Sequence, residues 1–361
     1  MNKKFKDIVR QIHLWLGLTT GLVVLVISIA GALYVFEEEI RAATQKDFRF
    51  VPVQEKPFVG LDQIITHFDK LAPKAKLRLI RITEQYPNAT VELSTSKDEV
   101  YYFNPYTAAL VSKRGLDWIE IDRKLHTSLL LGEPGEFIMR WSVVIFVLML
   151  ISGLVLWFPG KRRLLKQSFT IKKNASFKRL NYDLHNVLGF YAALVLLVTA
   201  LTGLYFAFKE VKTMASFFTG TKLTAGKIVT VAKVDTIKSV ASRYHKIYQE
   251  ASLKYPGALS TSFSVRAKGE LRLRMIYPYK WARNQNTFFY DEASGTPLRA
   301  KLYQDYNGAD LIEATNFDLH TGKLFGMPHK IFSFLASLIA ASLPITGFII
   351  WWKKRKLVWS R

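Results

Sequence analysis

The 361-residue sequence contains no cysteine. It therefore forms no disulfide bonds and offers no thiolate ligands for iron–sulfur clusters or zinc, and no Cys-x-x-Cys-His attachment for covalent haem. Acidic residues are scarce, with 28 Asp and Glu against 51 Lys and Arg, and the formal net charge is +23. Much of this charge flanks apolar segments, where a membrane surface accounts for it. We therefore predict no nucleic-acid partner.

Charged residues are missing from four long stretches, at 14–36, 141–160, 186–208 and 331–352. Each has about 20 residues, the length that a helix needs to cross the hydrocarbon core of a bilayer. The first follows basic residues as a signal peptide would, but its length favours a retained helix. The sequence therefore predicts an integral membrane α-helical bundle of four transmembrane helices embedded in a lipid bilayer.

Basic residues predict the orientation of the chain. Eight Lys and Arg residues, and no acidic residue, lie between positions 161 and 179. By the positive-inside rule this link is cytoplasmic. Both termini are then cytoplasmic, and two long segments lie in the periplasm of a bacterium, with the protein in the inner membrane. The predicted parts are a cytoplasmic N-terminus (1–13), transmembrane helices (14–36, 137–160, 185–208 and 331–352), periplasmic domains (37–136 and 209–330), a basic cytoplasmic loop (161–184) and a cytoplasmic tail (353–361).

The two halves of the chain repeat each other. Residues 13–17 (His-Leu-Trp-Leu-Gly) match residues 185–189 (His-Asn-Val-Leu-Gly), and residues 125–127 (Leu-His-Thr) recur at 319–321. Such a repeat indicates two structural units of the same kind. The external segments repeat more loosely and predict helices followed by strands. We expect helices at 61–71 and 234–248, and strands at 77–83, 89–94, 259–267 and 271–277. Each half is therefore a transmembrane helix, a small α+β domain and a second transmembrane helix.

The duplication also sorts the seven histidines. His13 matches His185 and His126 matches His320, and the helix directions place the first pair at the cytoplasmic side and the second at the outer side. Two facing histidines are what a six-coordinate haem requires of a protein. We therefore predict two b-type haems, although a simple metal site or plain interfacial histidines are alternatives. His329, which lies near His320, is a possible alternative outer ligand. The histidines without a counterpart are His67, His245 and His329.

Four glycines share a helical face with the first histidine pair. Gly17 and Gly189 lie four residues after their histidines, where a missing side chain leaves room for a flat macrocycle. Gly31 and Gly203 lie five helical turns on and are expected to adjoin the outer haem. Close packing between transmembrane helices is the alternative explanation for each.

Five motifs occur in order along the chain: His13-x-Trp-x-Gly17, Leu125-His126-Thr, Asp183-x-His185-x-x-x-Gly189, Leu319-His320-Thr-Gly322 and Ile345-Thr-Gly347-x-x-x-Trp351. In these motifs the sequence resembles the PepSY-associated transmembrane family, which includes iron-regulated membrane proteins and membrane ferric-siderophore reductases. The resemblance covers nearly the whole chain. It implies two PepSY-like periplasmic domains, haem b on the motif histidines, and one-electron reduction of a ferric siderophore or other ferric chelate.

Ferric-chelate reductase activity would release iron, because hard oxygen ligands hold ferric iron more tightly than ferrous iron. No Gly-x-Gly-x-x-Gly segment opens a strand–helix unit, so the electron donor is expected to be membrane quinol or a separate cytoplasmic reductase. The sequence identifies no catalytic residue. Two other functions remain open: a non-redox envelope protein that binds peptide or regulates a protease, and a metal-ion permease.

Overall fold

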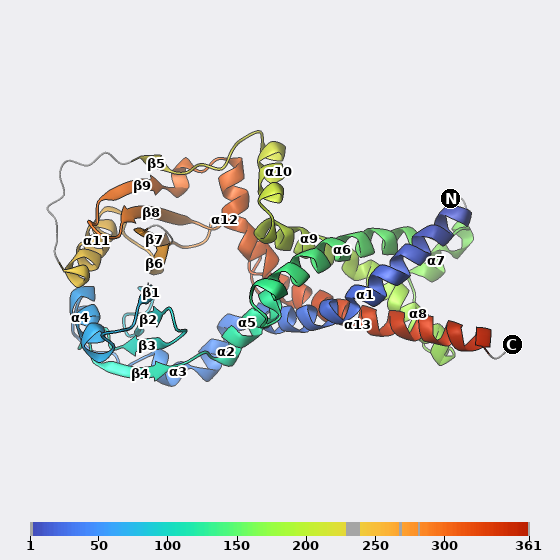
Figure 1. The fold of residues 1–361 in the computed structure, drawn as a ribbon, viewed down its shortest axis with the longest axis horizontal. Coiled ribbons are helices and arrows are strands. Elements are labelled where there is room, and N and C mark those ends of the chain that lie inside the picture. Colours follow the sequence, from blue (N-terminus) through green and yellow to red (C-terminus); the bar gives the residue numbers. More distant parts are fainter. Residues whose placement is uncertain (1–2, 229–238, 267–268, 281, 360–361) are drawn as a thin grey trace. The chain divides into compact units, whose positions relative to one another are not determined.

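The computed structural model describes residues 3–228, 239–266, 269–280 and 282–359, and it divides into two compact units. Unit 1 contains Met1–Glu37, Trp118–Thr213 and Asn316–Arg361, and unit 2 contains Glu38–Asp117 and Met214–Thr315. Each unit thus draws on both halves of the repeat. Figure 1 shows the chain coloured along its sequence.

Unit 1 contains four helices that are long and apolar enough to cross a membrane. They are α1 (Lys3–Val35), α6 (Glu133–Trp157), the continuous span Phe177–Ala207 and α13 (Met327–Trp359), with mean hydropathies of 2.0 to 2.3. At most a third of the residues in each apolar window are buried in the protein. Large side chains such as Leu22 and Leu194 are more than 70% exposed. Apolar surface of this extent belongs in lipid, and the protein is an integral membrane protein with four spanning helices.

The third span is assembled from three pieces. It begins as α8 (Phe177–Asp183), passes through one π-helical turn (Leu184–Leu188) and continues as α9 (Gly189–Ala207). In the bundle, α1 packs against α6 and α13, and α9 packs against the same two helices. Matching helices of the repeat therefore lie diagonally opposite each other, which indicates a pseudo-twofold arrangement.

Short elements connect the spans. In unit 1, α5 (Trp118–Ser128) precedes α6 and packs against both α1 and α6. The link after α6 contains a 3-10 turn (Arg162–Leu164) and α7 (Leu165–Ser168). The other short helices are α2 (Glu37–Thr44), α3 (Lys46–Arg49), α10 (Lys209–Thr219) and the 3-10 turn Tyr303–Asp305.

Unit 2 is built on one antiparallel sheet of nine strands, in the order β4-β3-β2-β1-β6-β7-β8-β9-β5. The first half of the chain supplies α4 (Leu61–Leu71) and the strands β1 (Leu77–Ile82), β2 (Val91–Thr95), β3 (Val100–Phe103) and β4 (Leu110–Arg114). The second half supplies α11 (Val240–Lys254) and the strands β5 (Lys227–Ile228), β6 (Ser260–Arg266), β7 (Glu270–Ile276), β8 (Gln285–Asp291) and β9 (Pro297–Lys301).

The sheet explains why the expected elements form. Alternate residues of β7, Leu271, Leu273 and Met275, are buried in one core together with the apolar faces of α4 and α11. This is the period-two pattern of a strand with one apolar face. The expected helix at 61–71 is present with the same bounds, and the bounds of the four expected strands differ by at most two residues from those observed. Residues 234–238 of the other expected helix and residue 267 of an expected strand lie outside the described part of the chain.

The two external segments do not form two separate compact domains. Strands β1 and β6 pair directly, with Ile80 opposite Phe263 and Ile82 opposite Thr261, and this pairing joins the two half-sheets (Figure 1). The helices α4 and α11 pack against each other over the same core. Each segment alone would expose the unpaired backbone groups of a strand edge and the apolar side chains of part of this core. Pairing the two half-sheets covers both.

A carboxyl group lies beside this junction. Glu84 follows β1, and both its side-chain oxygens are buried near the hydroxyls of Thr261 and Tyr248. Burial raises the pKa of Glu84, and the neighbouring hydroxyls only partly offset that rise. The ionised form is therefore disfavoured in the folded state.

Glu84→Gln is expected to raise the thermal unfolding midpoint at neutral pH. A raised folded-state pKa means that the stability present below the unfolded pKa is lost as the pH rises through the folded pKa. The glutamine variant keeps a similar shape but never ionises, so its midpoint should vary less than the wild-type midpoint between pH 5 and 8. Differential scanning fluorimetry across this pH range measures both effects. Identical pH profiles for the two proteins would contradict the assignment.

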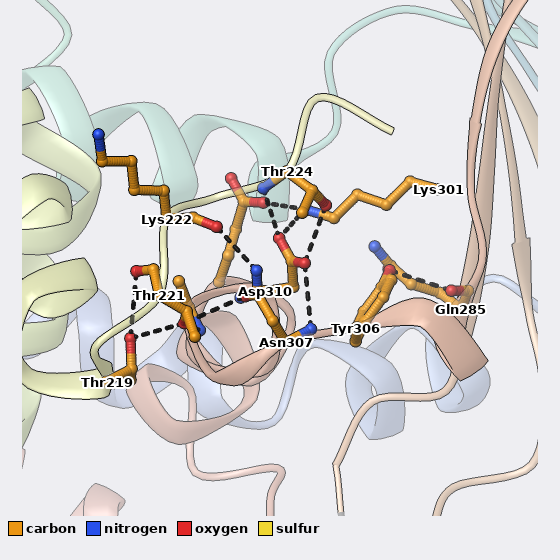
Figure 2. A network of polar contacts seen from close by, with 11 residues as sticks. Thr219, Thr221, Lys222, Thr224, Gln285, Lys301, Tyr306, Asn307 and Asp310 are labelled. Carbon is orange, nitrogen blue, oxygen red and sulfur yellow. Dashed lines mark hydrogen bonds and ion pairs between the residues drawn. The ribbon is translucent and has the colours of Figure 1, made fainter. Parts of the chain in front are cut away.

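The second half also contains α12 (Gly308–His320), whose first turn is fixed by buried polar contacts (Figure 2). The Asp310 amide donates to Asn307 Oδ1 (3.0 Å) and the Asn307 amide donates to Asp310 Oδ2 (3.2 Å), which is a reciprocal capping box. The Thr224 amide and hydroxyl also donate to Asp310, and Lys301 forms an ion pair with it at 2.7 Å. Asp310 itself is fully buried.

Candidate histidine sites in the helical bundle

The structure brings His13 and His185 together near one end of the bundle. His13 lies in the first half of α1, and His185 lies in the π-helical turn that precedes α9. The centres of their rings are 6.4 Å apart. A π-helical turn shifts the direction of the following side chains and is common at functional sites. Asp183, buried next to this turn, accepts from the Lys172 amide (3.2 Å) and forms an ion pair with Arg179 (2.9 Å).

His126 and His320 meet in the same way at the other end of the bundle. His126 lies near the end of α5 and His320 is the last residue of α12. Their ring centres are 6.0 Å apart. His126 is bonded to Ile27, which lies 14 residues beyond His13 on α1. At 1.5 Å per residue, the two pairs are therefore separated by roughly 21 Å along this helix.

His13 and His185, called the inner pair after the orientation predicted from the sequence, contact hydroxyl groups at matching positions of the repeat. His13 Nδ1 is 2.8 Å from Ser152 Oγ on α6, and His185 Nδ1 is 2.9 Å from Thr346 Oγ1 on α13. Both hydroxyls donate their protons to carbonyl oxygens of their own helices. With their protons directed to these carbonyls, the hydroxyl oxygens can accept from the imidazoles, an arrangement that places the imidazole proton on Nδ1.

His126 and His320, called the outer pair after the same prediction, contact backbone carbonyls at matching positions. His126 Nδ1 lies 2.8 Å from the Ile27 carbonyl, and His320 Nδ1 lies 3.0 Å from the Thr199 carbonyl. The Thr202 hydroxyl is also 3.0 Å from His320 Nδ1. A carbonyl only accepts, so Nδ1 carries the proton in this pair as well. Within the described residues, none of the four Nε2 atoms has a hydrogen-bond partner, and each keeps a lone pair for a ligand.

The geometry of both pairs fits an ion bound between two imidazoles. Because metal–nitrogen bonds are about 2.1 Å long, two imidazoles that share one ion have ring centres no more than about 6.5 Å apart. The observed values are 6.4 and 6.0 Å. Hydrogen bonds that fix the tautomer and orientation are also typical of metal-ligating histidines. Among the described residues, no group of three or more His, Asp or Glu side chains is placed to hold a metal ion. Each pair thus offers two imidazoles, the number of protein ligands that a six-coordinate haem would take.

The outer histidines lie outside the four spanning helices and are neutral. Burial lowers the pKa of His126, although the hydrogen bond to the Ile27 carbonyl opposes this effect. Burial, and next the nearby His126, lower the pKa of His320 to about 4. Neutral imidazole is the form that binds metal ions.

The four predicted glycines divide into two kinds. A Cβ atom on Gly31 would lie 2.9 Å from His126 Cε1, and one on Gly203 would lie 3.3 Å from His320 Cε1. These glycines admit the imidazole rings. Gly17 and Gly189 instead face Met149 on α6 and Leu343 on α13, at 2.9 and 3.4 Å from their Cβ positions. Their predicted role beside a macrocycle stays a prediction.

Two further glycines contact the inner rings and were not assigned from the sequence. Cβ positions on Gly153 and Gly347 lie 3.4 and 3.2 Å from the Cε1 atoms of His13 and His185. Each directly follows the hydroxyl residue that binds the same ring, Ser152 or Thr346. The sequence repeat could have identified these two glycines, because the Ser-Gly and Thr-Gly pairs occupy matching positions 194 residues apart.

The remaining histidines lie elsewhere. His329, the alternative outer ligand, packs its ring against Phe325 at 5.4 Å, whereas His320 is the histidine that faces His126. His67 Nδ1 contacts the Ala108 carbonyl at 2.6 Å, and His245 Nδ1 accepts from the Leu61 amide at 3.2 Å, both within unit 2.

These observations define a class of protein: an integral membrane protein whose four-helix bundle carries two pairs of facing histidines. The sequence matches the family model described as the PepSY-associated TM region over residues 10–354. The chain belongs to this family. A search among curated proteins finds no match.

Proposed function

We propose that the protein binds two b-type haems, one between His13 and His185 and one between His126 and His320. The observation that carries this proposal is the repeated geometry of the two pairs, with ring separations of 6.4 and 6.0 Å and Nδ1 engaged in all four histidines. When bound, haem supplies one-electron redox chemistry. The chain's own residues would supply two imidazoles to each haem, with hydrogen bonds to Nδ1 that fix their tautomers and glycines that leave space for the imidazole rings.

We further propose that the protein works in the bacterial inner membrane, with both termini in the cytoplasm and unit 2 in the periplasm. The basic link between α6 and α8 supports this orientation. The inner pair then lies near the cytoplasmic face and the outer pair near the periplasmic face. Redox groups at these two levels suit the transfer of electrons from membrane quinol or a separate cytoplasmic reductase to a periplasmic acceptor.

The acceptor that we propose is a ferric siderophore or other ferric chelate, which makes the protein a ferric-chelate reductase. Two findings support this choice. The chain belongs to the PepSY-associated family, and its sequence motifs resemble those of the ferric-siderophore reductases in that family. One electron converts ferric iron to the ferrous form, which oxygen ligands hold less tightly, and the iron is released.

The first test is the reduced-minus-oxidised absorption spectrum of the detergent-purified protein, with a pyridine haemochrome count. We expect two haems per chain in the wild type and about one in His13→Ala or His126→Ala, because each variant lacks one of the two histidines that would hold the haem at one site. His67→Ala, which removes a histidine of unit 2, should keep both. A colourless wild-type protein made with adequate haem would overturn the proposal and favour a non-redox peptide-binding or protease-regulating role. Metal bound without porphyrin would favour the permease.

A further inference from the structure

Two arginines lie side by side on the face of the unit 2 sheet that is opposite to its apolar core. Leu271, Leu273 and Met275 of β7 enter the core, so the alternate residues Arg272 and Arg274 are directed to the other face. Both are half-buried. Their direct neighbours across the strands are uncharged: Ser264 and Phe289 beside Arg272, and Ser262 and Thr287 beside Arg274.

Three neighbouring cations of this face have carboxylate partners, whereas Arg266 at the end of β6 is exposed to solvent. Towards β1, Arg81 pairs with Glu92 at 3.3 Å. Towards β9, Arg299 pairs with Glu270 at 2.5 Å. Lys301 pairs with Asp310 at 2.7 Å, as Figure 2 shows, and with Glu313 at 3.0 Å. The carboxylates nearest to β7 are thus already engaged by other residues.

Arg272 and Arg274 differ from these cations. Within the described part of unit 2, Arg272 makes one side-chain hydrogen bond, from Nε to Ser264 Oγ (3.1 Å), and no ion pair. Arg274 makes neither, and its Nε is buried. A buried guanidinium donor without an acceptor is costly, because water no longer solvates it. This cost is removed if an acceptor binds from outside the chain.

The local field also favours an anion. Burial, followed by the charges of Arg274 and Arg266, lowers the pKa of Arg272 to about 10. Burial and then the charge of Arg283 lower the pKa of Arg274, while Tyr306 and Glu313 act in the opposite direction. Both guanidinium groups stay protonated at neutral pH. Their mutual repulsion is therefore not relieved by loss of a proton.

We propose that Arg272 and Arg274, with the hydroxyls of Ser262 and Ser264, form a binding site for a small anion that carries several carboxylates. Guanidinium binds carboxylate through two parallel hydrogen bonds. Alternate residues of a strand are about 6.6 Å apart, a spacing that suits two carboxylates of one ligand better than a single compact phosphate. The ligand that we infer is a ferric chelate with free carboxylates, and this identification rests on the proposed function.

Gallium(III) citrate is the probe for this site, because gallium(III) resembles ferric iron in charge but is not reduced under these conditions. Titration calorimetry on the full-length, detergent-purified protein measures its affinity. We expect Arg272→Gln/Arg274→Gln to bind at least tenfold more weakly than the wild type. Arg272→Lys/Arg274→Lys, which keeps the charge, should bind more tightly than the glutamine variant. The matched control is Arg78→Gln, an exposed arginine of β1 that lies 3.9 Å from Asp98 and should bind within twofold of the wild type.

Two results would overturn the proposal: no binding of gallium citrate by the wild type up to millimolar concentration, or equal binding by the wild type and the double glutamine variant. Equal binding of a neutral gallium trishydroxamate would also overturn it, since the site is inferred to select negative charge. The unfolding temperature of the glutamine variant without ligand should equal or exceed that of the wild type, which separates lost binding from lost folding. The titration needs no haem, so its failure is distinguishable from failure of the proposed function.

Discussion

Gly31→Ala is expected to release most of the haem from the outer site while leaving the inner site occupied. The added Cβ would lie 2.9 Å from His126 Cε1 and 3.2 Å from Nδ1. Carbon atoms pack at about 3.5–4.0 Å, so the ring must move, and it then loses its 2.8 Å hydrogen bond to the Ile27 carbonyl. We expect the haemochrome count to fall from about two to about one per chain, because an axial ligand is misplaced. Gly31→Leu should have the same effect more completely.

Gly17→Ala is the matched control for this experiment. It lies on the same helix, and its Cβ would also meet an atom at 2.9 Å, but that atom is Cε of Met149, the end of a flexible side chain. From this contact alone we expect Gly17→Ala to keep both haems, whereas the macrocycle role predicted from the sequence would remove the haem of the inner pair. Alanine is also the better helix former by about 1 kcal/mol, so neither substitution should unfold α1. Two haems in Gly31→Ala would show that the ring is not held against this glycine. One haem in Gly17→Ala would support the role of Gly17 beside a macrocycle.

Asp310→Ala should destabilise the start of α12 by about 3 kcal/mol, the lower range for breaking a buried ion pair by removing one partner. The carboxylate is fully buried and the Lys301 side chain is only 12% exposed. The substitution also removes acceptors for the Thr224 and Asn307 amides. Hydrogen exchange measured by mass spectrometry on peptides covering residues 297–320 should be about a hundredfold faster, since each 1.4 kcal/mol is worth about tenfold.

Asp305→Ala supplies the comparison, since Asp305 forms a 2.7 Å ion pair with Lys227, whose side chain is 77% exposed. Exposed ion pairs contribute about 0–1 kcal/mol, so exchange in the same peptides should change less than fivefold. An equal effect of the two substitutions would contradict a structural role for the buried network.

The pH dependence of this network has a defined sign. Burial acts to raise the pKa of Asp310, but the hydrogen bonds from Lys301 and Thr224 outweigh it, and the pKa is lowered. A lowered folded-state pKa gives stability that is present above the unfolded pKa and is lost as the pH falls through the folded pKa. The network therefore contributes fully at neutral pH.

The sequence by itself determined the four spanning helices and the histidine pairing. Runs of about 20 apolar residues have few stable solutions other than a spanning helix, because the bilayer leaves backbone groups no partners outside the segment. The duplication then identified His13 with His185 and His126 with His320 as partners. In the structure the ring centres of each pair are no more than 6.4 Å apart. That haem binds between them is our proposal.

Only the tertiary structure decided what surrounds these histidines. Hydrogen bonds to Ser152, Thr346 and the Ile27 carbonyl join helices that are far apart in sequence. A helical period gives the face on which a residue lies, but not the side chain of another helix that meets it. For this reason Gly17 and Gly31, which share one face of α1, face different neighbours: a methionine side chain and an imidazole ring.

The joining of the external segments was likewise decided by the tertiary structure. Local sequence predicted strands in each segment, and those strands formed, but strand propensity does not specify which edges pair. The pairing of β1 with β6 is favourable because it satisfies two edges and closes one core beneath α4 and α11. The same sheet places Arg272 and Arg274 near Arg81, Arg299 and Lys301, which form ion pairs with carboxylates. This contrast depends on partners that the fold brings together. The sequence fixes how many charged residues the chain has. Whether a given charge is paired with an opposite charge depends on distance and burial, which only the folded chain defines.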